Sequence, residues 1–129
     1  MKNKIFIAID TKSRKKARLI ISQSKIKNYK IGYKFGLEFF NSKNGRNFIS
    51  KLKKKIVFVD LKLHDIPNTM LSTLLAIKDL KINYLTVHIS SGLKALKQVK
   101  KISGRTKIAG VTILTSLDIK DLRAMGHKR

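Results

Sequence analysis

The sequence predicts an α/β fold in which the strands form a parallel sheet. Five short runs rich in β-branched and aromatic residues recur along the 129 residues. Their spacing of roughly 25 residues leaves room for a helix between consecutive strands, as the crossover between two parallel strands requires. Helical patterns and turn residues occupy the intervals, so strands and helices alternate along the whole chain.

The strands are assigned where apolar residues concentrate between turn signals. In the first of them, Phe6 and Ala8 share one face with Asp10, as the period of two residues in a strand requires. The third contains the most apolar run, IVFV. The five predicted strands are Lys4–Asp10, Tyr29–Tyr33, Ile56–Lys62, Tyr84–His88 and Lys107–Leu114.

The helices are assigned from apolar spacing and from residues typical of helix ends. Pro67 suits the start of a helix, and Gly126 suits the position after a helix stops. The turn Asn44-Gly45 divides the second helical segment into two. The predicted helices are Lys12–Ser24, Phe35–Phe40, Asn47–Lys54, Thr69–Leu80, Leu93–Lys101 and Asp118–Met125.

The phase of the strands favours a (β/α)8 barrel over an open doubly wound sheet. Every predicted strand delivers a polar residue near its C-terminal end, and barrel enzymes collect catalytic residues from several strands at that edge. The loop after the first strand, residues 10–13, contains no glycine, which argues against a dinucleotide site. A barrel has eight strands and usually about 250 residues. We therefore expect one domain, residues 1–129, that corresponds to about the first five βα units.

The composition indicates a packed domain without disulfides. Hydrophobic residues make up 43% of the chain, which is enough for a core. Because there is no cysteine, neither disulfides nor thiolate metal sites are available. No apolar run approaches the roughly 18 residues of a membrane span, and the N-terminal apolar run is shorter than that of a signal peptide. We therefore expect a soluble, cytoplasmic protein.

The charge of the chain is strongly positive, with 30 Lys and Arg against 7 Asp and Glu, or +23 formally. Such an excess can mark a nucleic-acid or membrane binder. The lysines are spread over all predicted helices and loops, and they form no single basic arm. We therefore interpret lysine as the ordinary surface residue here and expect neither nucleic acid nor membrane as a partner. A basic surface would still attract a phosphorylated, anionic substrate.

The most informative segment reads VDLKLHDIPNT, residues 59–69. It begins where the apolar run of the third strand ends. Because side chains on a strand alternate between faces, Asp60 and Lys62 lie on the same side, and Asp65 follows in a loop that Pro67 stiffens. Charged residues at the end of an apolar strand are costly unless they pair or take part in chemistry. This segment is therefore the predicted active site.

Extended by one residue, FVDLKLHDIPNT resembles the central D-x-K-x-x-D-I-x-x-T motif of the orotidine 5′-phosphate decarboxylase family. Four other segments resemble strands of that family in the same order: FIAID the first, YKIGYKFGLEFF the second, TVHISSG the fourth and GVTILTS the fifth. The match extends from about Ile5 to about Asp121 and covers the N-terminal part of a full-length member. It implies a TIM-barrel enzyme that converts orotidine 5′-monophosphate to UMP in pyrimidine biosynthesis.

The resemblance also implies a role for each residue of the site. Lys62 would donate a proton to C6 of the pyrimidine after CO2 leaves, and Asp60 would lie against the substrate carboxylate. Asp65 would complete an alternating Lys-Asp-Lys-Asp array and, with Thr69, reach the neighbouring subunit's site, which implies a homodimer. The remaining implied contacts are Asp10 with the ribose hydroxyls, Lys30 between the ribose and Asp60 as the first member of the array, and Thr115, or alternatively Ser116, with the pyrimidine.

These roles suit a reaction that needs neither a cofactor nor a metal. Loss of CO2 leaves an electron pair on C6, and an ammonium aimed at that carbon can stabilise the charge and then protonate it. Lys62 stays charged between two aspartates, because nearby carboxylates favour the ammonium form. Asp60 beside the substrate carboxylate would raise the energy of the ground state, which is relieved as CO2 departs.

The same residues allow other interpretations. Asp65 could cap the following helix, Asp10 could be an ordinary loop residue, and Thr115 could cap the last helix. His88 at a strand end is interpreted as a hydrogen-bonded barrel residue rather than a metal ligand. At the level of function, the D-x-K-x-x-D element is shared with sugar-phosphate decarboxylases of the same superfamily. A non-enzymatic remnant or basic binding fragment is the remaining alternative.

The resemblance also identifies parts of the family's site that the five units lack. In the family, loops after the seventh and eighth strands supply a glutamine and an arginine that hold the substrate phosphate, and such remote binding drives catalysis. A five-stranded sheet also leaves two strand edges and apolar faces exposed. We therefore expect the chain by itself to be unstable or to associate, and to decarboxylate poorly or not at all.

Overall fold

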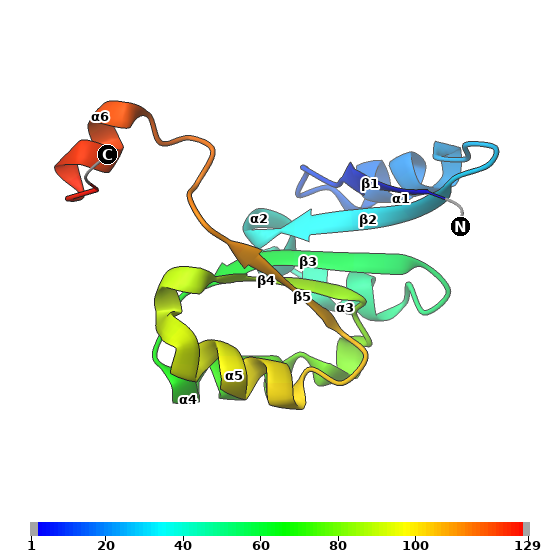
Figure 1. The fold of residues 1–129 in the computed structure, drawn as a ribbon. Coiled ribbons are helices and arrows are strands. Elements are labelled where there is room, and N and C mark those ends of the chain that lie inside the picture. The colour runs from blue at the N-terminus through cyan, green and yellow to red at the C-terminus, as the bar shows by residue number, and fades with distance from the viewer. Residues whose placement is uncertain (1–2, 128–129) are drawn as a thin grey trace.

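Five parallel strands form one sheet in the computed structural model, which describes residues 3–127 (Figure 1). The strands follow one another across the sheet in the order of the sequence, and every neighbouring pair is parallel. Their bounds are β1 Lys4–Ala8, β2 Lys30–Gly36, β3 Ile56–Leu63, β4 Tyr84–His88 and β5 Lys107–Val111.

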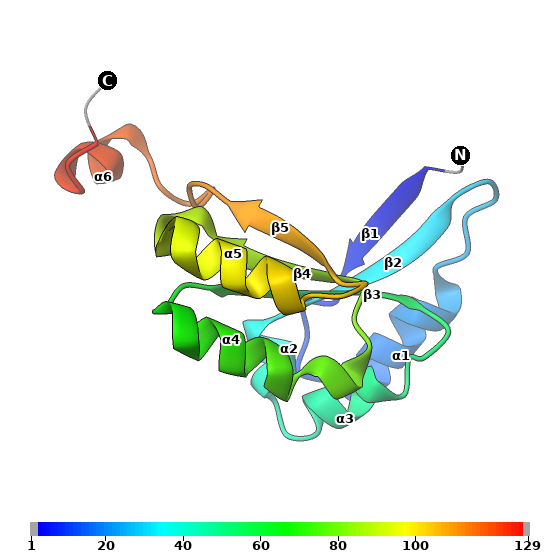
Figure 2. The ribbon, with the colours of Figure 1, turned by 60° about the horizontal axis from the view of Figure 1, so that its bottom comes forward.

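Helices connect the strands and lie together on one side of the sheet, as the rotated view shows (Figure 2). Each interval between consecutive strands contains at least one helix, and β2 is followed by two short ones. The helices are α1 Arg14–Gln23, α2 Leu37–Asn41, α3 Gly45–Ser50, α4 Pro67–Ala76, α5 Gly92–Ile102 and α6 Ile119–Ala124, with single 3-10 turns η1 Lys78–Leu80 and η2 Ile89–Ser91.

This arrangement is that of consecutive βα units of a (β/α)8 barrel. In a doubly wound sheet the strand order reverses at one point, and helices cover both faces. Here the order β1-β2-β3-β4-β5 contains no reversal, and helices α1–α5 lie on the same side of the sheet. The predicted architecture, about the first five units of a barrel, is therefore confirmed.

The hydrophobic core lies between the sheet and its helices. Phe35 on β2, Val59 on β3 and Leu85 on β4 have no exposed surface and point toward the helical layer. Burying a side chain of this size stabilises the fold by about 1.5–3 kcal/mol. The helices contribute their own fully or almost fully buried residues, which are Ala17, Phe39, Ile49, Met70, Ala95 and Val99.

The opposite face of the sheet carries an aromatic cluster near the amino ends of the strands. The ring centroids of Phe6, Phe58 and Tyr84 are 5.1–5.7 Å apart, and Phe6 meets each of the other two edge to face. Gly32 on β2 makes room for this cluster, since a Cβ at that position would lie 2.5 Å from the Phe6 ring. The face of the sheet that would line the barrel interior is therefore apolar near the amino ends of the strands and polar near their carboxyl ends.

Strand β2 differs most from its prediction. It was expected at Tyr29–Tyr33, with a helix from Phe35, but it continues to Gly36 and α2 begins at Leu37. The reason is tertiary pairing, because Phe35 is fully buried and lies opposite Val59 of β3. The shift by three residues changes which lysine of β2 reaches the carboxyl end of the sheet.

The chain leaves the sheet after β5 and reaches α6 through an extended segment (Figure 1). Asp118 caps α6 by accepting hydrogen bonds from the backbone N–H groups of Lys120 and Asp121, and Asp121 bonds back to the Asp118 N–H. Gly126 follows this helix with a φ of +86°, as its predicted role as a helix stop requires. Within residues 3–127, no helix has both the length and the apolar character needed to cross a membrane.

Candidate functional site

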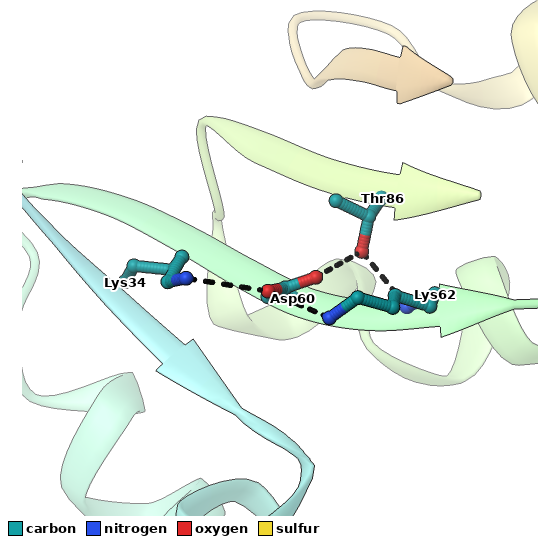
Figure 3. A network of polar contacts seen from close by, with 4 residues as sticks. All are labelled: Lys34, Asp60, Lys62 and Thr86. Atoms are coloured by element: carbon teal, nitrogen blue, oxygen red, sulfur yellow. Dashed lines mark hydrogen bonds and ion pairs between the residues drawn. The ribbon is translucent and has the colours of Figure 1, made fainter. Parts of the chain in front are cut away.

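Four polar side chains converge near the carboxyl ends of β2, β3 and β4 (Figure 3). Asp60 is at their centre, and its side chain is only 11% exposed. Its Oδ1 accepts a hydrogen bond of 2.8 Å from Thr86 Oγ1, and its Oδ2 accepts one of 3.0 Å from Lys62 Nζ. Lys34 Nζ lies 3.5 Å from the same Oδ2. One carboxylate is therefore held by two ammonium groups and a hydroxyl.

The alternation of β3 explains why this cluster faces away from the helices. Val59 and Leu61 are buried in the core on the helical side of the sheet. Asp60, between them in sequence, must point to the opposite side, where the strands have no helical cover. Lys34 and Thr86 share that side, because they lie on neighbouring strands and contact Asp60 directly.

A bulge in β3 sets the backbone position of Lys62. Val59 lies opposite Leu85 and Leu63 lies opposite Val87, so the register of β3 against β4 shifts between these pairs. Lys62 has a φ of +48°, in the left-handed region. That conformation costs a residue with a side chain roughly 1–2 kcal/mol, and bulges of this kind often re-aim side chains next to active sites.

Thr86 links the bulge to the carboxylate. Its hydroxyl donates to Asp60 Oδ1 and accepts a hydrogen bond of 2.8 Å from the backbone N–H of Lys62. The residue is buried, with 7% of its surface exposed. A single hydroxyl therefore satisfies a backbone group that the bulge releases from the sheet and fixes the orientation of Asp60.

The surroundings of Asp60 keep its carboxyl ionised. Burial alone would raise the pKa of Asp60, because it disfavours the charged form. Hydrogen bonds from Lys62 and Thr86, together with the positive charges of Lys62 and Lys34, outweigh that effect and hold the pKa below its ordinary value. The cluster of two cations and one anion is therefore suited to an anionic ligand.

The arrangement can position an ammonium group against a reacting atom. The side chains of Lys34 and Lys62 are 36% and 39% exposed, so both nitrogens can reach a molecule bound on the open side of the sheet. Asp60 restrains the Lys62 ammonium group through their hydrogen bond of 3.0 Å. The geometry suits delivery of a proton to a carbanion formed next to the cluster.

Lys30 does not lie where its predicted role requires. It is the first residue of β2, it is exposed, and it lies opposite Lys4 of β1, whereas Asp60 lies opposite Gly36. Six residues of strand, or about 20 Å, separate these two positions. Lys34 contacts Asp60 instead. The expected face of β2 was right, but the strand was expected to end too early, so the wrong lysine was assigned to the array.

Asp65 and Thr69 are exposed and lie outside the cluster in one chain. The Asp65 carboxylate accepts a hydrogen bond of 2.7 Å from the Ile66 backbone N–H. Because Ile66 is the residue that precedes the first turn of α4, Asp65 does not cap that helix. Both side chains remain accessible to a second molecule, and their roles in a neighbouring site stay predictions.

Asp10 lies at the same edge of the sheet as the cluster. It follows Ile9, whose backbone N–H donates to the carbonyl of Lys34 at 2.8 Å, and its side chain is exposed. Thr115 and Ser116 are exposed in the segment that leads away from β5 toward α6. Because Asp118 caps that helix, neither serves as the cap, and the structure does not bring Thr115 to the cluster.

Two histidines lie side by side at the ends of neighbouring strands, with His64 directly after β3 and His88 the last residue of β4. The rings of His64 and His88 lie 5.0 Å apart between centroids, and Ser90 Oγ is 3.3 Å from His64 Nε2. His64 lies against His88, which is on the same face of β4 as Thr86. Across the part of the chain that the structure describes, no three or more His, Cys, Asp or Glu side chains group as metal ligands.

Sequence reasoning missed two members of the cluster, Lys34 and Thr86. Both carried a signal in the strand period: Lys34 is four residues after Lys30 on the same face of β2, and Thr86 shares its face with His88. The period alone does not show that Lys34 and Thr86 lie beside Asp60. That depends on the register between strands: Gly36 of β2 lies opposite Asp60 of β3, which brings Lys34 near the carboxylate.

Comparisons with known proteins agree on one family. The model described as "Orotidine 5'-phosphate decarboxylase / HUMPS family" matches residues 3–129. The chain is 42% identical over 129 residues to the orotidine 5′-phosphate decarboxylase of Sphingopyxis alaskensis, a match that covers 98% of this chain and 56% of the relative. It is 43% identical over 132 residues to the corresponding protein of a Wolbachia from Brugia malayi, covering 98% and 57%.

A solved structure agrees with these relatives. The crystal structure of orotidine 5′-phosphate decarboxylase from Lactobacillus acidophilus matches with a TM-score of 0.83 at 29% identity, over 98% of this chain and 60% of that one. The fold is therefore shared across the described residues. The chain spans little more than half the length of the curated relatives that it matches.

Proposed function

The chain belongs to the orotidine 5′-phosphate decarboxylase / HUMPS family, and on this premise we propose that it acts in the cofactor-free decarboxylation of orotidine 5′-monophosphate to UMP. The observation that carries the proposal is the buried Asp60 carboxylate, held between Lys62 at 3.0 Å and Lys34 at 3.5 Å. The names of the relatives at 42% and 43% identity support the same substrate. UMP formation would place the chain in pyrimidine biosynthesis.

Lys62 is the proposed proton donor. The bond between C6 and the substrate carboxyl breaks, CO2 leaves, and the electron pair stays on C6. Lys62 Nζ then transfers a proton to C6 to form the C6–H bond, and solvent returns a proton to the amine. Its hydrogen bond to Asp60 supports this role, because the carboxylate holds the Lys62 Nζ in place on the open side of the sheet.

Asp60 and Lys34 are proposed to prepare the substrate for that step. An ionised Asp60 beside the substrate carboxylate would repel it, and departure of neutral CO2 would relieve the repulsion. Lys34 takes the place in the array first expected for Lys30, between Asp60 and the ribose. Asp10 is proposed to bind the ribose hydroxyls, which is supported by its place at the same edge of the sheet.

Two parts of the proposed site come from outside these five βα units. One comes from a second subunit, and the other comes from later βα units of the barrel. Asp65 and Thr69 are proposed to enter the site of a second subunit, which is supported by their exposure. The substrate phosphate is proposed to be held by loops after the seventh and eighth strands, as in the family. The described sheet has five strands, so we expect the 129-residue chain by itself to turn over substrate poorly.

The test is release of labelled CO2 from carboxyl-labelled orotidine 5′-monophosphate. Lys62→Ala and Lys34→Ala should each lower the rate, the first by roughly 10²–10⁴-fold, as loss of a positioned acid does. Lys30→Ala is the matched control, because it removes a lysine from the same strand and face but leaves the rate unchanged. Growth of a pyrimidine auxotroph that carries each variant gives a second measure where turnover in vitro is slow.

A sugar-phosphate substrate is the alternative that the same assay can separate. 3-Keto-gulonate phosphate is offered in parallel with orotidine 5′-monophosphate. Turnover of the nucleotide supports the proposal. Turnover of the sugar phosphate alone would contradict it, as would equal losses of rate in the Lys30 and Lys62 variants.

A further inference from the structure

A second concentration of positive charge lies away from the polar cluster. Residues 11–59 contain fifteen Lys and Arg and one acidic residue, Glu38. The two stretches on either side of Glu38, residues 11–37 and 39–59, contain no Asp or Glu. The fold brings these stretches together, because α1 from the first packs beside α3 from the second (Figure 2).

The two stretches enclose a pair of adjoining hollows, which together are called the basic groove. One hollow, of about 340 Å³, lies between α1 and the segment that contains α3, and its apolar lining comes from Ile21, Phe48 and Leu52. The other, of about 670 Å³, lies at the amino ends of β2 and β3. They share the lining residues Ser24, Lys25 and Lys55, so the two hollows lie next to each other. Its cations are Arg14, Arg18, Lys25, Lys27, Lys30, Lys51, Lys54 and Lys55.

The cations of the groove have no acidic partners in the structure. Among residues 3–127, the ion pairs involve Lys12, Lys34, Arg46 and Lys62, and none of these lines the groove. No acidic residue is among the described residues of its walls. All eight of its Lys and Arg side chains are exposed. Like charges held on one concave surface repel each other, and a bound polyanion would relieve that repulsion.

We infer that the basic groove binds a single-stranded nucleic acid through its phosphate backbone. Eight cations over two joined hollows exceed what one phosphate can pair with, which favours a chain of phosphates over a single anion. A concave path suits a flexible single strand better than a rigid duplex. Tyr29 lines the groove with 43% of its surface exposed, and an exposed aromatic ring is the usual stacking surface for an unpaired base.

The groove is separate from the proposed decarboxylase site. Lys30 and Ile56 line it and are the first residues of β2 and β3, whereas Lys34, Asp60 and Lys62 lie toward the opposite ends of the same strands. The inference therefore does not rest on the proposed function. It also revises the interpretation of the lysines as uniformly spread, because only the packing of α1 beside α3 reveals that those of residues 11–59 gather on one surface.

The experiment is a binding titration of the 129-residue chain with a fluorescent single-stranded RNA of about 20 nucleotides, longer than the usual site of one small domain. The groove variant carries Arg18→Glu, Lys25→Glu and Lys55→Glu. The control variant carries Lys94→Glu, Lys97→Glu and Lys101→Glu, which are exposed on α5 and change the net charge by the same amount. Circular dichroism establishes that each variant is folded, and the corresponding Gln variants replace any that is not.

The expected result is a loss of affinity that depends on position as well as charge. The groove variant should bind at least roughly tenfold more weakly, and its slope of log K against log salt should fall by about 2, since each phosphate contact to a single strand contributes about 0.7. The control variant should lose less than threefold. Tyr29→Leu should weaken binding roughly fivefold, as loss of one stacked base does.

Three outcomes would overturn the inference. Equal losses in the groove and control variants would show that net charge alone attracts the strand. Equal or tighter binding of a duplex of the same sequence would show that the groove does not select single strands. Anionic phospholipid vesicles that bind through the groove and displace the RNA would assign it to a membrane surface instead.

Discussion

Thr86 shows how much of the candidate site depends on one uncharged residue. Its hydroxyl is the only group of the Asp60 cluster that bonds both a side chain and a backbone within the described residues. It acts on Asp60 and Lys62 through position, because it lies on the same face of the sheet but is itself buried, with its hydroxyl bonded to both residues. We therefore regard Thr86 as a positioning residue.

Replacement of Thr86 by Val should disturb the cluster, whereas replacement by Ser should not. Val keeps the shape of the side chain but removes a hydrogen bond to a charged group and leaves the Lys62 N–H unpaired, which costs about 2 kcal/mol. Urea unfolding measures the free-energy loss, and NMR titration should show a higher Asp60 pKa in the Val variant. A Val variant with wild-type stability and wild-type Asp60 titration would contradict this role.

The lowered pKa of Asp60 makes stability depend on acid pH. The folded state favours the ionised carboxylate more than the unfolded state does, so the associated stabilisation is fully present above the ordinary Asp pKa of about 3.9. It is lost as the pH falls through the lower pKa of the folded protein. Urea midpoints between neutral and acid pH should therefore fall more steeply for the wild type than for Asp60→Asn. Parallel curves for the two proteins would show that Asp60 does not titrate in this way.

Within the site, the strand face of each residue could be predicted from the sequence, but its position along the strand could not. Asp60 and Lys62 were assigned to one face from strand period alone, and their 3.0 Å contact agrees with that. Lys30 and Lys34 lie on the same face of β2, so periodicity could not choose between them. The choice depends on where β2 meets β3, which is fixed by side chains far apart in the sequence.

At the scale of elements, the predictions succeeded where apolar residues are bounded by clear turns. β4 has its predicted bounds, Tyr84–His88, because the turn residue Asn83 precedes it and a 3-10 turn follows. The bulge in β3 left no sequence signal, since a lysine has no preference for the left-handed conformation that Lys62 adopts. The Lys62 N–H at this bulge bonds the Thr86 hydroxyl, which lies on another strand and far away in the sequence.

Two glycines of β2 should differ sharply when a methyl group is added. At Gly32 a Cβ would lie 2.5 Å from the ring of Phe6, which is wedged between Phe58 and Tyr84, so Gly32→Ala should destabilise by about 1–3 kcal/mol. Gly36→Ala is the control, because nothing lies within 4 Å of its Cβ position. Unfolding free energies in urea compare the two, and equal values would contradict the close packing at Gly32.

At the scale of the whole molecule, the sheet has helices on one side and an open face on the other (Figure 2). The barrel class was predictable because it depends on strand order and on the phase of polar residues, which are properties of the whole sequence. The basic groove was not predictable, since it depends on which helices pack together. Oligomeric state belongs to the same scale, because it depends on surfaces that periodicity does not distinguish.

The proposed sharing of sites between subunits can be tested by mixing inactive variants. Lys62→Ala and Asp65→Ala should each be inactive, but mixed dimers would contain one complete site. Random exchange makes half of all dimers mixed, so about a quarter of wild-type activity should return in a two-fold symmetric dimer. Sedimentation velocity would establish the dimer independently, and would also detect the association expected from the open strand edges. No recovery of activity in proven mixed dimers would contradict the sharing of sites.

The sequential order of the strands has a consequence for synthesis of the protein. Lys34, Asp60, Lys62 and Thr86 all precede β5, and each lies on a strand that pairs with its immediate predecessor along the chain. Pairing between neighbours in sequence closes loops of about 20 residues each, which costs less chain entropy than closing loops that span the whole chain. The charged cluster can therefore assemble on the ribosome as soon as β4 has emerged, with α1–α4 already available to cover the apolar side of the sheet.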